Sequence, residues 1–119
     1  MAELQKILYV EDEPDIHQIV KTLLTKKGQL VWAKNLQEAR DWLKKQHFEL
    51  ILLDIALPDG LGLSLLSEIQ QQHPTSKLVI YSAYDVGQEY MQQVHAVLSK
   101  SNTDNHTLLA TIESLLSAN

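Results

Sequence analysis

Short hydrophobic runs alternate along this chain with longer stretches in which hydrophobic and polar residues are mixed. Five of the short runs are mostly rich in Val, Ile and Leu, the composition of parallel strands buried on both faces. These runs are Ile7–Val10, Leu30–Ala33, Leu50–Asp54, Leu78–Ser82 and His95–Ser99. Parallel strands need long crossover connections, and the stretches between the runs are long enough to supply them. The pattern therefore predicts five parallel β-strands.

The stretch after the first run has the clearest helical pattern. Its hydrophobic residues fall at i, i+3, i+4, i+7 and i+8, and they are Ile16, Ile19, Val20, Leu23 and Leu24. This spacing predicts a helix with one hydrophobic face, which Gly28 is expected to end. A second helix is predicted from an N-cap at Asn35 to about Gln46, and a third from Gly62 to Gln72, before Pro74.

Two more helices complete the alternation. The last is predicted from hydrophobic residues on one side of a C-terminal stretch, namely Leu108, Ile112, Leu115 and Leu116. The segment Val86–Gln93 is expected to form only a short, weakly stable helix, because it is rich in Gln and contains Gly87. The predicted fold class is α/β: a doubly wound, five-stranded parallel sheet with helices on both faces, formed by a single domain over residues 1–119.

Composition narrows the possible functions. Hydrophobic residues make up 45% of the 119 residues and the formal net charge is −5, which is typical of a globular protein and argues against direct binding of nucleic acid. The absence of cysteine excludes disulfides and thiolate metal sites. No run approaches the roughly 20 hydrophobic residues of a membrane span, and the N-terminal residues do not resemble a signal peptide. We therefore expect no membrane association and a cytoplasmic location.

Carboxylates follow two of the predicted strands. Asp54 ends the run in the segment LILLDIALPDG, and Glu11 and Asp12 come directly after Val10. In open α/β sheets, ligands bind at the carboxyl ends of the strands, so these three carboxylates are expected at one edge. They would repel one another unless a cation joined them, and oxygen ligands of this kind suit Mg2+. At the same edge, the hydroxyl of Ser82 and the ammonium of Lys100 are suited to contacting a phosphoryl group.

The motifs VEDEP, LLDIALPDG, YSA and LSK, spaced along an alternating β/α chain of this length, resemble the receiver domain of two-component response regulators. The resemblance covers essentially the whole chain and implies a flavodoxin-like (βα)5 fold with strand order 2-1-3-4-5. It implies that Asp54 is the phosphoacceptor and that Glu11, Asp12, Asp54 and the backbone carbonyl of Ala56 hold Mg2+. It also implies that Ser82 and Lys100 contact the phosphoryl group, and that the turn Leu57–Gly60 follows the phosphorylated residue.

The resemblance further implies a signalling switch. The phosphoryl donor would be a phosphohistidine on a sensor histidine kinase or a histidine phosphotransfer protein, and the signal would pass by conformational change to a downstream effector that the sequence does not identify. The domain would promote its own phosphorylation and dephosphorylation without turning over an external substrate. It would be a monomer or a weak dimer that depends on phosphorylation.

Two residues depart from the family pattern, and they leave an alternative function open. Val97 stands where the family usually has an aromatic residue, and Ser101 replaces the proline that usually follows the lysine. A pseudo-receiver, an interaction module that works without phosphorylation, would account for both changes. A phosphatase of the haloacid dehalogenase type would need a second Asp at the position of Ala56, and neither a G-x-G-x-x-G motif nor a P-loop supports nucleotide binding.

Overall fold

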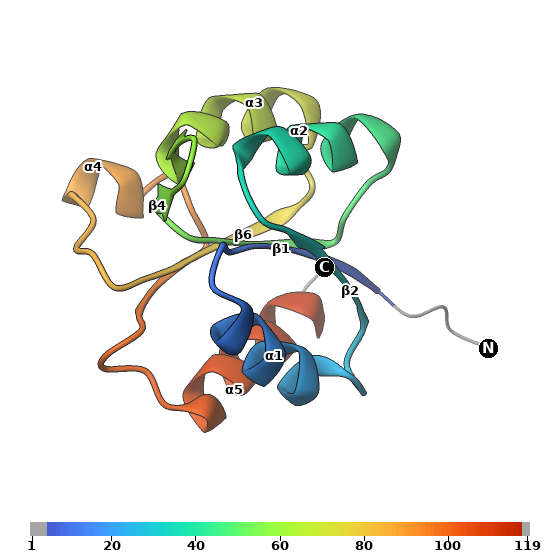
Figure 1. The fold of residues 1–119 in the computed structure, drawn as a ribbon, viewed down its shortest axis with the longest axis vertical. Coiled ribbons are helices and arrows are strands. Elements are labelled where there is room, and N and C mark those ends of the chain that lie inside the picture. The colour runs from blue at the N-terminus through green and yellow to red at the C-terminus, as the bar shows by residue number, and fades with distance from the viewer. Residues whose placement is uncertain (1–4, 118–119) are drawn as a thin grey trace.

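Five parallel strands form one sheet in the computed structural model, which describes residues 5–117 (Figure 1). The strand order is β2-β1-β3-β6-β7. The strands are β1 (Lys6–Val10), β2 (Gln29–Ala33), β3 (Leu50–Leu53), β6 (Lys77–Ser82) and β7 (Ala96–Ser99). Counted in chain order, these five strands have the order 2-1-3-4-5, so the predicted topology is confirmed.

Helices cover both faces of the sheet, as Figure 1 shows. The helices are α1 (Pro14–Leu24), α2 (Leu36–Lys45), α3 (Leu66–Gln72), α4 (Gln88–Met91) and α5 (Asn105–Ser117). Helices α2 and α3 lie on one face, and α1 and α5 lie on the other. The doubly wound α/β class predicted from the alternation is therefore confirmed.

Alternate residues of the central strands build two separate hydrophobic cores, because side chains along a strand point to opposite faces. Leu8 and Val10 of β1 pack in the core under α2 and α3. Ile7 and Tyr9 pack in the core under α1 and α5. All four side chains are fully buried, which explains why the strand reads as a continuous hydrophobic run instead of an alternating one.

The turn after β3 contains structure that the hydrophobic pattern did not predict. Two short strands, β4 (Ala56–Leu57) and β5 (Gly60–Leu61), pair as an antiparallel hairpin. Gly60 has a φ of 143°, a conformation that glycine adopts readily. A 3₁₀ turn, η1 (Gly62–Leu65), then leads into α3, so the helix expected from Gly62 becomes α-helical only at Leu66. Strands β4 and β5 have two residues each, which is too short to show the alternation of hydrophobic and polar residues by which a strand is predicted.

Helix α1 and strand β3 both end earlier than expected. Helix α1 ends at Leu24, and the carbonyl of that residue accepts from the backbone N–H groups of Lys27 and Gly28 in a closing turn. Strand β3 ends at Leu53, and β6 keeps its predicted end at Ser82. The β3 boundary has a local cause: the Asp54 carboxylate accepts a hydrogen bond of 2.7 Å from the N–H of Ile55, which turns the chain out of the sheet.

Helix α4 is short, as predicted. It has four residues, none of them buried, and Gly87 at its N-cap offers no side-chain cap. An isolated helix of this length has little stability of its own. The low stability expected of this segment remains a prediction.

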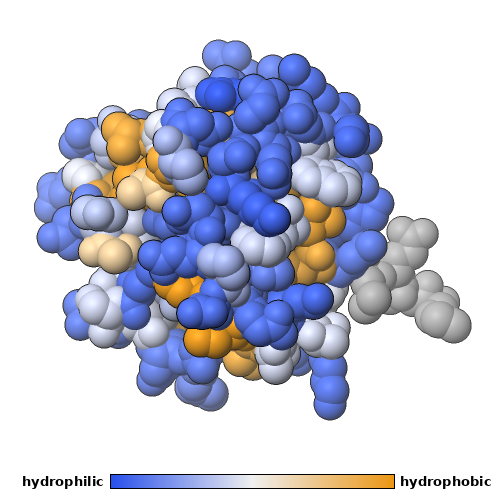
Figure 2. All heavy atoms as spheres, viewed as in Figure 1, coloured by the Kyte–Doolittle hydropathy of each residue, from blue (hydrophilic) through white to orange (hydrophobic). Residues whose placement is uncertain are grey.

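Figure 2 shows a mostly hydrophilic face with several separate hydrophobic areas. The large hydrophobic side chains that are about half exposed or more are Ile19, Leu61, Tyr84 and Met91. Among residues 5–117, no helix has the length and hydrophobicity needed to cross a bilayer.

Candidate functional site

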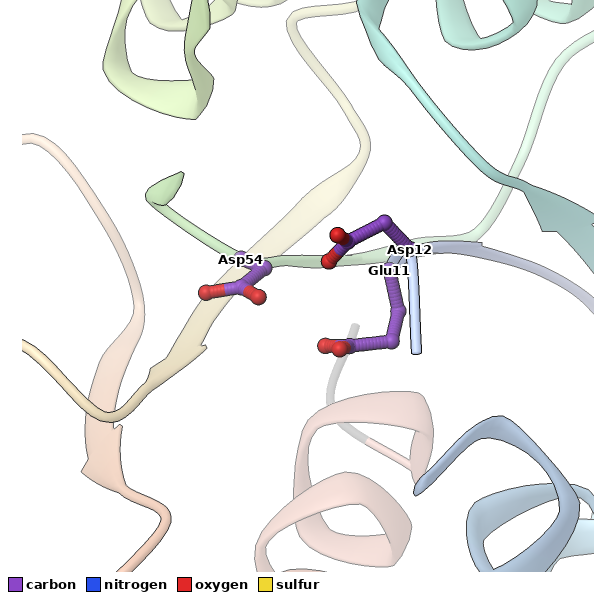
Figure 3. A group of neighbouring side chains, drawn as sticks. All are labelled: Glu11, Asp12 and Asp54. Carbon is purple, nitrogen blue, oxygen red and sulfur yellow. The ribbon is translucent and has the colours of Figure 1, made fainter. Parts of the chain in front are cut away.

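Three carboxylates meet at the carboxyl edge of the sheet (Figure 3). Glu11 and Asp12 follow β1, and Asp54 follows the neighbouring strand β3. One carboxylate oxygen of each residue lies within 4.8 Å of the others. In the part of the chain that the structure describes, this is the one group of three acidic, His or Cys residues close enough to share a metal ion. The carboxylate cluster predicted from the strand ends is thus present.

The sheet itself positions two of these residues. The backbone N–H of Glu11 donates to the carbonyl of Ala33 at 3.0 Å, and the N–H of Asp54 donates to the carbonyl of Val10 at 3.1 Å. Both bonds continue the hydrogen-bonding ladder one step beyond the strands. The backbones of Glu11 and Asp54 are therefore held in place by hydrogen bonds to the sheet.

Burial differs sharply within the cluster. Glu11 is 0% exposed and Asp54 is 5% exposed, whereas Asp12 belongs to the exposed surface. The site therefore has a buried floor, formed by Glu11 and Asp54, and an open rim at Asp12.

Lys100 binds both buried carboxylates. Its Nζ lies 2.8 Å from Oε2 of Glu11 and 3.1 Å from Oδ2 of Asp54, and its side chain is 14% exposed. Its backbone N–H donates to the carbonyl of Ser82 at 2.9 Å, which holds the residue at the end of β6 and β7. Lys100 directly follows β7, which ends at Ser99. One ammonium thus binds two buried carboxylates.

Electrostatics distinguish Glu11 from an ordinary surface carboxylate. Burial raises its pKa from 4.5 to about 7; the hydrogen bond from Lys100 opposes this shift, and the charge of Asp54 adds to it. Burial alone would lower the pKa of the Lys100 ammonium, but the hydrogen bond and charge of Glu11, together with Asp54, raise it overall.

The raised pKa of Glu11 predicts that the metal-free protein loses stability as pH rises. The folded state binds this proton more tightly than the unfolded state does, so the stabilisation is complete below pH 4.5 and disappears as pH rises through about 7. Between about pH 5 and about pH 8, we expect Glu11 to account for a loss of roughly 2 kcal/mol in the free energy of unfolding. Urea denaturation in EDTA at both pH values measures it. Glu11→Gln should lack this part of the pH dependence, and an unchanged dependence in that variant would contradict the assignment.

Ser82 lies at the same edge but is held differently. It is the last residue of β6 and is buried, and its Oγ accepts a hydrogen bond of 3.3 Å from the N–H of Tyr84. The hydroxyl hydrogen is left free to turn toward another acceptor. Ala56 begins β4 two residues after Asp54 and is half-buried. That Ser82 contacts a phosphoryl group and that the Ala56 carbonyl binds Mg2+ remain predictions.

The structure adds two side chains that sequence reasoning did not assign to the site. The Nε1 of Trp32 donates to the backbone carbonyl of Glu11. Asp59, in the turn after Asp54, accepts from the N–H groups of Leu36 at 2.8 Å and Gln37 at 3.1 Å, at the start of α2. An Asp in a turn is a recognisable signal for such bonds, but nothing in a single sequence identifies the distant partner.

The donor set fits Mg2+. It consists of carboxylate oxygens, the hard ligands that Mg2+ prefers, and Asp12 is exposed enough to reach a hydrated ion. Because Lys100 balances only one of three carboxylate charges, a divalent cation would neutralise the rest.

Fold and site together define a class: a doubly wound α/β domain with an acidic pocket and a lysine at the carboxyl edge of its sheet. Residues 7–113 match the family model described as the response regulator receiver domain. The chain therefore belongs to the response regulator receiver family.

Individual relatives agree with this membership. The response regulator protein PilR of Pseudomonas aeruginosa is 44% identical over 81 residues, 67% of this chain and 18% of PilR. The autoinducer 2 sensor kinase/phosphatase LuxQ of Vibrio parahaemolyticus is 36% identical over 73% of this chain and 10% of its own length. The response regulator protein TrrA of Thermotoga maritima, solved in complex with Mg2+ and BeF, has a TM-score of 0.83 and 26% identity, covering 94% of this chain and 99% of TrrA. The chain thus spans only a small part of these two curated relatives.

Proposed function

We propose that this domain accepts a phosphoryl group on the carboxylate of Asp54 from a phosphohistidine and acts as a signalling switch. The observation that carries the proposal is the pairing of Lys100 with both Asp54 and Glu11 at the carboxyl edge of the sheet. This arrangement places a nucleophilic carboxylate beside a fixed positive charge, next to the exposed carboxylate of Asp12. It fits phosphoryl transfer better than an interaction module, which would not need these side chains.

Apart from the phosphohistidine donor, the transfer needs only water as a source of the proton. A carboxylate oxygen of Asp54 attacks phosphorus in line with the P–N bond, a P–O bond forms, and the P–N bond breaks. The electron pair of the broken bond stays on the imidazole nitrogen of the donor, which takes a proton from water. Hydrolysis of the resulting acyl phosphate by water returns Asp54 to its carboxylate form and resets the switch.

Each residue of the site has a definite part in this proposal. Lys100 pairs with the phosphoryl oxygens as charge moves onto them, and the Ser82 hydroxyl donates to one of them. Glu11, Asp12, Asp54 and the Ala56 carbonyl would hold Mg2+, which would supply further neutralisation of charge on the phosphoryl oxygens.

The phosphoryl donor, the downstream effector and the cellular location follow from this function. The donor is a sensor histidine kinase or a histidine phosphotransfer protein, and the match to part of LuxQ supports a link with kinases of that kind. The phosphorylated domain, folding as one unit, passes the signal to a downstream effector by conformational change and forms at most a weak dimer. Because such a donor is charged from ATP, the proposal places the domain in the cytoplasm.

The first test is the intact mass of the protein after incubation with acetyl phosphate and Mg2+. We expect the wild-type protein to gain one phosphoryl group, and Asp54→Asn, which keeps the shape but lacks the nucleophilic oxygen, to gain none. The wild-type protein in EDTA is the second control. If neither acetyl phosphate nor a phosphohistidine donor labels the protein, or if Asp54→Asn is labelled equally, the proposal fails and a pseudo-receiver is the better description.

A further inference from the structure

We propose that Trp32 is a positioning residue for the metal site: through its indole N–H it fixes the peptide that joins Glu11 to Asp12 and so sets the position of the Asp12 carboxylate. The inference deepens the proposed function and rests on it. Its starting point is the hydrogen bond from Nε1 of Trp32 to the backbone carbonyl of Glu11.

Both backbone polar groups of Glu11 are bound by strand β2. The N–H donates to the carbonyl of Ala33 at 3.0 Å, and the carbonyl accepts from the side chain of Trp32. The first bond continues the sheet and would form with any side chain at position 32. The second depends on an indole N–H. Since a peptide unit is planar, holding the carbonyl of Glu11 also fixes the direction of the N–H of Asp12.

The indole ring is itself held in place. It stacks on the imidazole of His17 from α1, with ring centroids 3.9 Å apart and planes inclined by 8°. The ammonium of Lys34 lies 5.0 Å from the centre of the same ring. These contacts restrict the rotamer of Trp32, so its N–H is already directed at the carbonyl when the site is formed.

Asp12 is the ligand that most needs such support. The carboxylate of Glu11 is buried and bound to Lys100 at 2.8 Å. Asp12 is exposed, and within residues 5–117 its carboxylate has no hydrogen bond. Its position therefore depends on the backbone from which it projects. Groups that orient metal ligands in this indirect way typically change metal affinity by 10-fold or more when they are removed.

The test is the Mg2+ affinity of Trp32→Phe, measured by NMR titration of the amide resonances with MgCl2. Phenylalanine keeps an aromatic ring for His17 to stack on but has no N–H to donate. We expect the dissociation constant for Mg2+ to rise about tenfold. A second variant with 3-benzothienylalanine at position 32 keeps the bicyclic ring and replaces the N–H by sulfur; it should show the same rise and gives the answer even if Trp32→Phe folds poorly.

The matched control is Trp42→Phe. Trp42 belongs to α2, is half-buried against the core under α2 and α3, and its ring lies 5.3 Å from the ammonium of Lys45. This control should bind Mg2+ as the wild-type protein does. Equal Mg2+ affinity in the wild-type protein and both Trp32 variants would overturn the role of Trp32 alone. A wild-type protein that binds no Mg2+ would overturn the proposed metal site together with this inference.

Discussion

Replacing Gly62 with alanine is expected to lower the free energy of unfolding by about 3 kcal/mol and to disturb the turn after Asp54. A Cβ at position 62 would lie 1.9 Å from the carbonyl oxygen of Asp54 and 3.0 Å from its carbonyl carbon. Both are backbone atoms, so no side-chain rotation can relieve the contact. The N–H of Gly62 also donates to the carbonyl of Ile55, which keeps the two segments together.

Urea denaturation of Gly62→Ala measures the loss, and Gly87→Ala is the matched control. The nearest atoms to a Cβ at position 87 would be the carboxylate oxygens of Glu89, at 2.9 and 3.0 Å, and this side chain can move away. The control should unfold within about 1 kcal/mol of the wild-type protein. Because the clash is with the residue that bears the nucleophile, Gly62→Ala should also be phosphorylated more slowly by acetyl phosphate. Wild-type stability in Gly62→Ala would show that the turn can shift freely.

Lys100→Met is expected to destabilise the metal-free protein by about 3 kcal/mol at about pH 8. The substitution leaves the carboxylates of Glu11 and Asp54, which are 0% and 5% exposed, without the ammonium that now binds both. A buried charge without a partner is costly, and two carboxylates side by side repel each other. Methionine retains most of the length of the lysine side chain. The loss in the free energy of unfolding therefore measures mainly the effect of removing the positive charge.

Two comparisons test this interpretation of Lys100→Met. Adding Glu11→Gln removes one of the two unpaired charges, so the double variant should recover a large part of the lost stability. Lys26→Met, at an exposed position after α1, should change the free energy of unfolding by less than about 0.5 kcal/mol. If Lys100→Met unfolds like the wild-type protein, or if the double variant is no more stable than the single one, the two carboxylates do not depend on Lys100.

The sequence predicted the sheet and its acidic edge because each rests on a local pattern. Buried strands such as Leu50–Leu53 are continuous hydrophobic runs, and the residue that follows such a run lies at a known edge of a parallel sheet. Asp54 could therefore be placed near Glu11 without knowledge of any contact. The N-cap at Asn35 was predicted in the same way, and its Oδ1 accepts from the N–H of Glu38 at 2.8 Å.

The remaining features depend on residues far apart in the chain. The indole of Trp32 is 21 positions from the carbonyl that it binds, and Asp59 is 23 positions from Leu36. The close approach of Gly62 to Asp54 likewise follows from the path of the turn between them. No hydrophobic period encodes such contacts, so they could be found only in the folded chain.

Asp59 joins the turn that follows Asp54 to helix α2, because its carboxylate caps the start of that helix. Asp59 lies in the turn between β4 and β5 and accepts hydrogen bonds from the first two N–H groups of α2. When the turn after Asp54 is displaced, these two hydrogen bonds must either break, which frees the start of α2, or carry the helix with them. Two hydrogen bonds to Asp59 thus connect the start of α2 to the turn that follows Asp54.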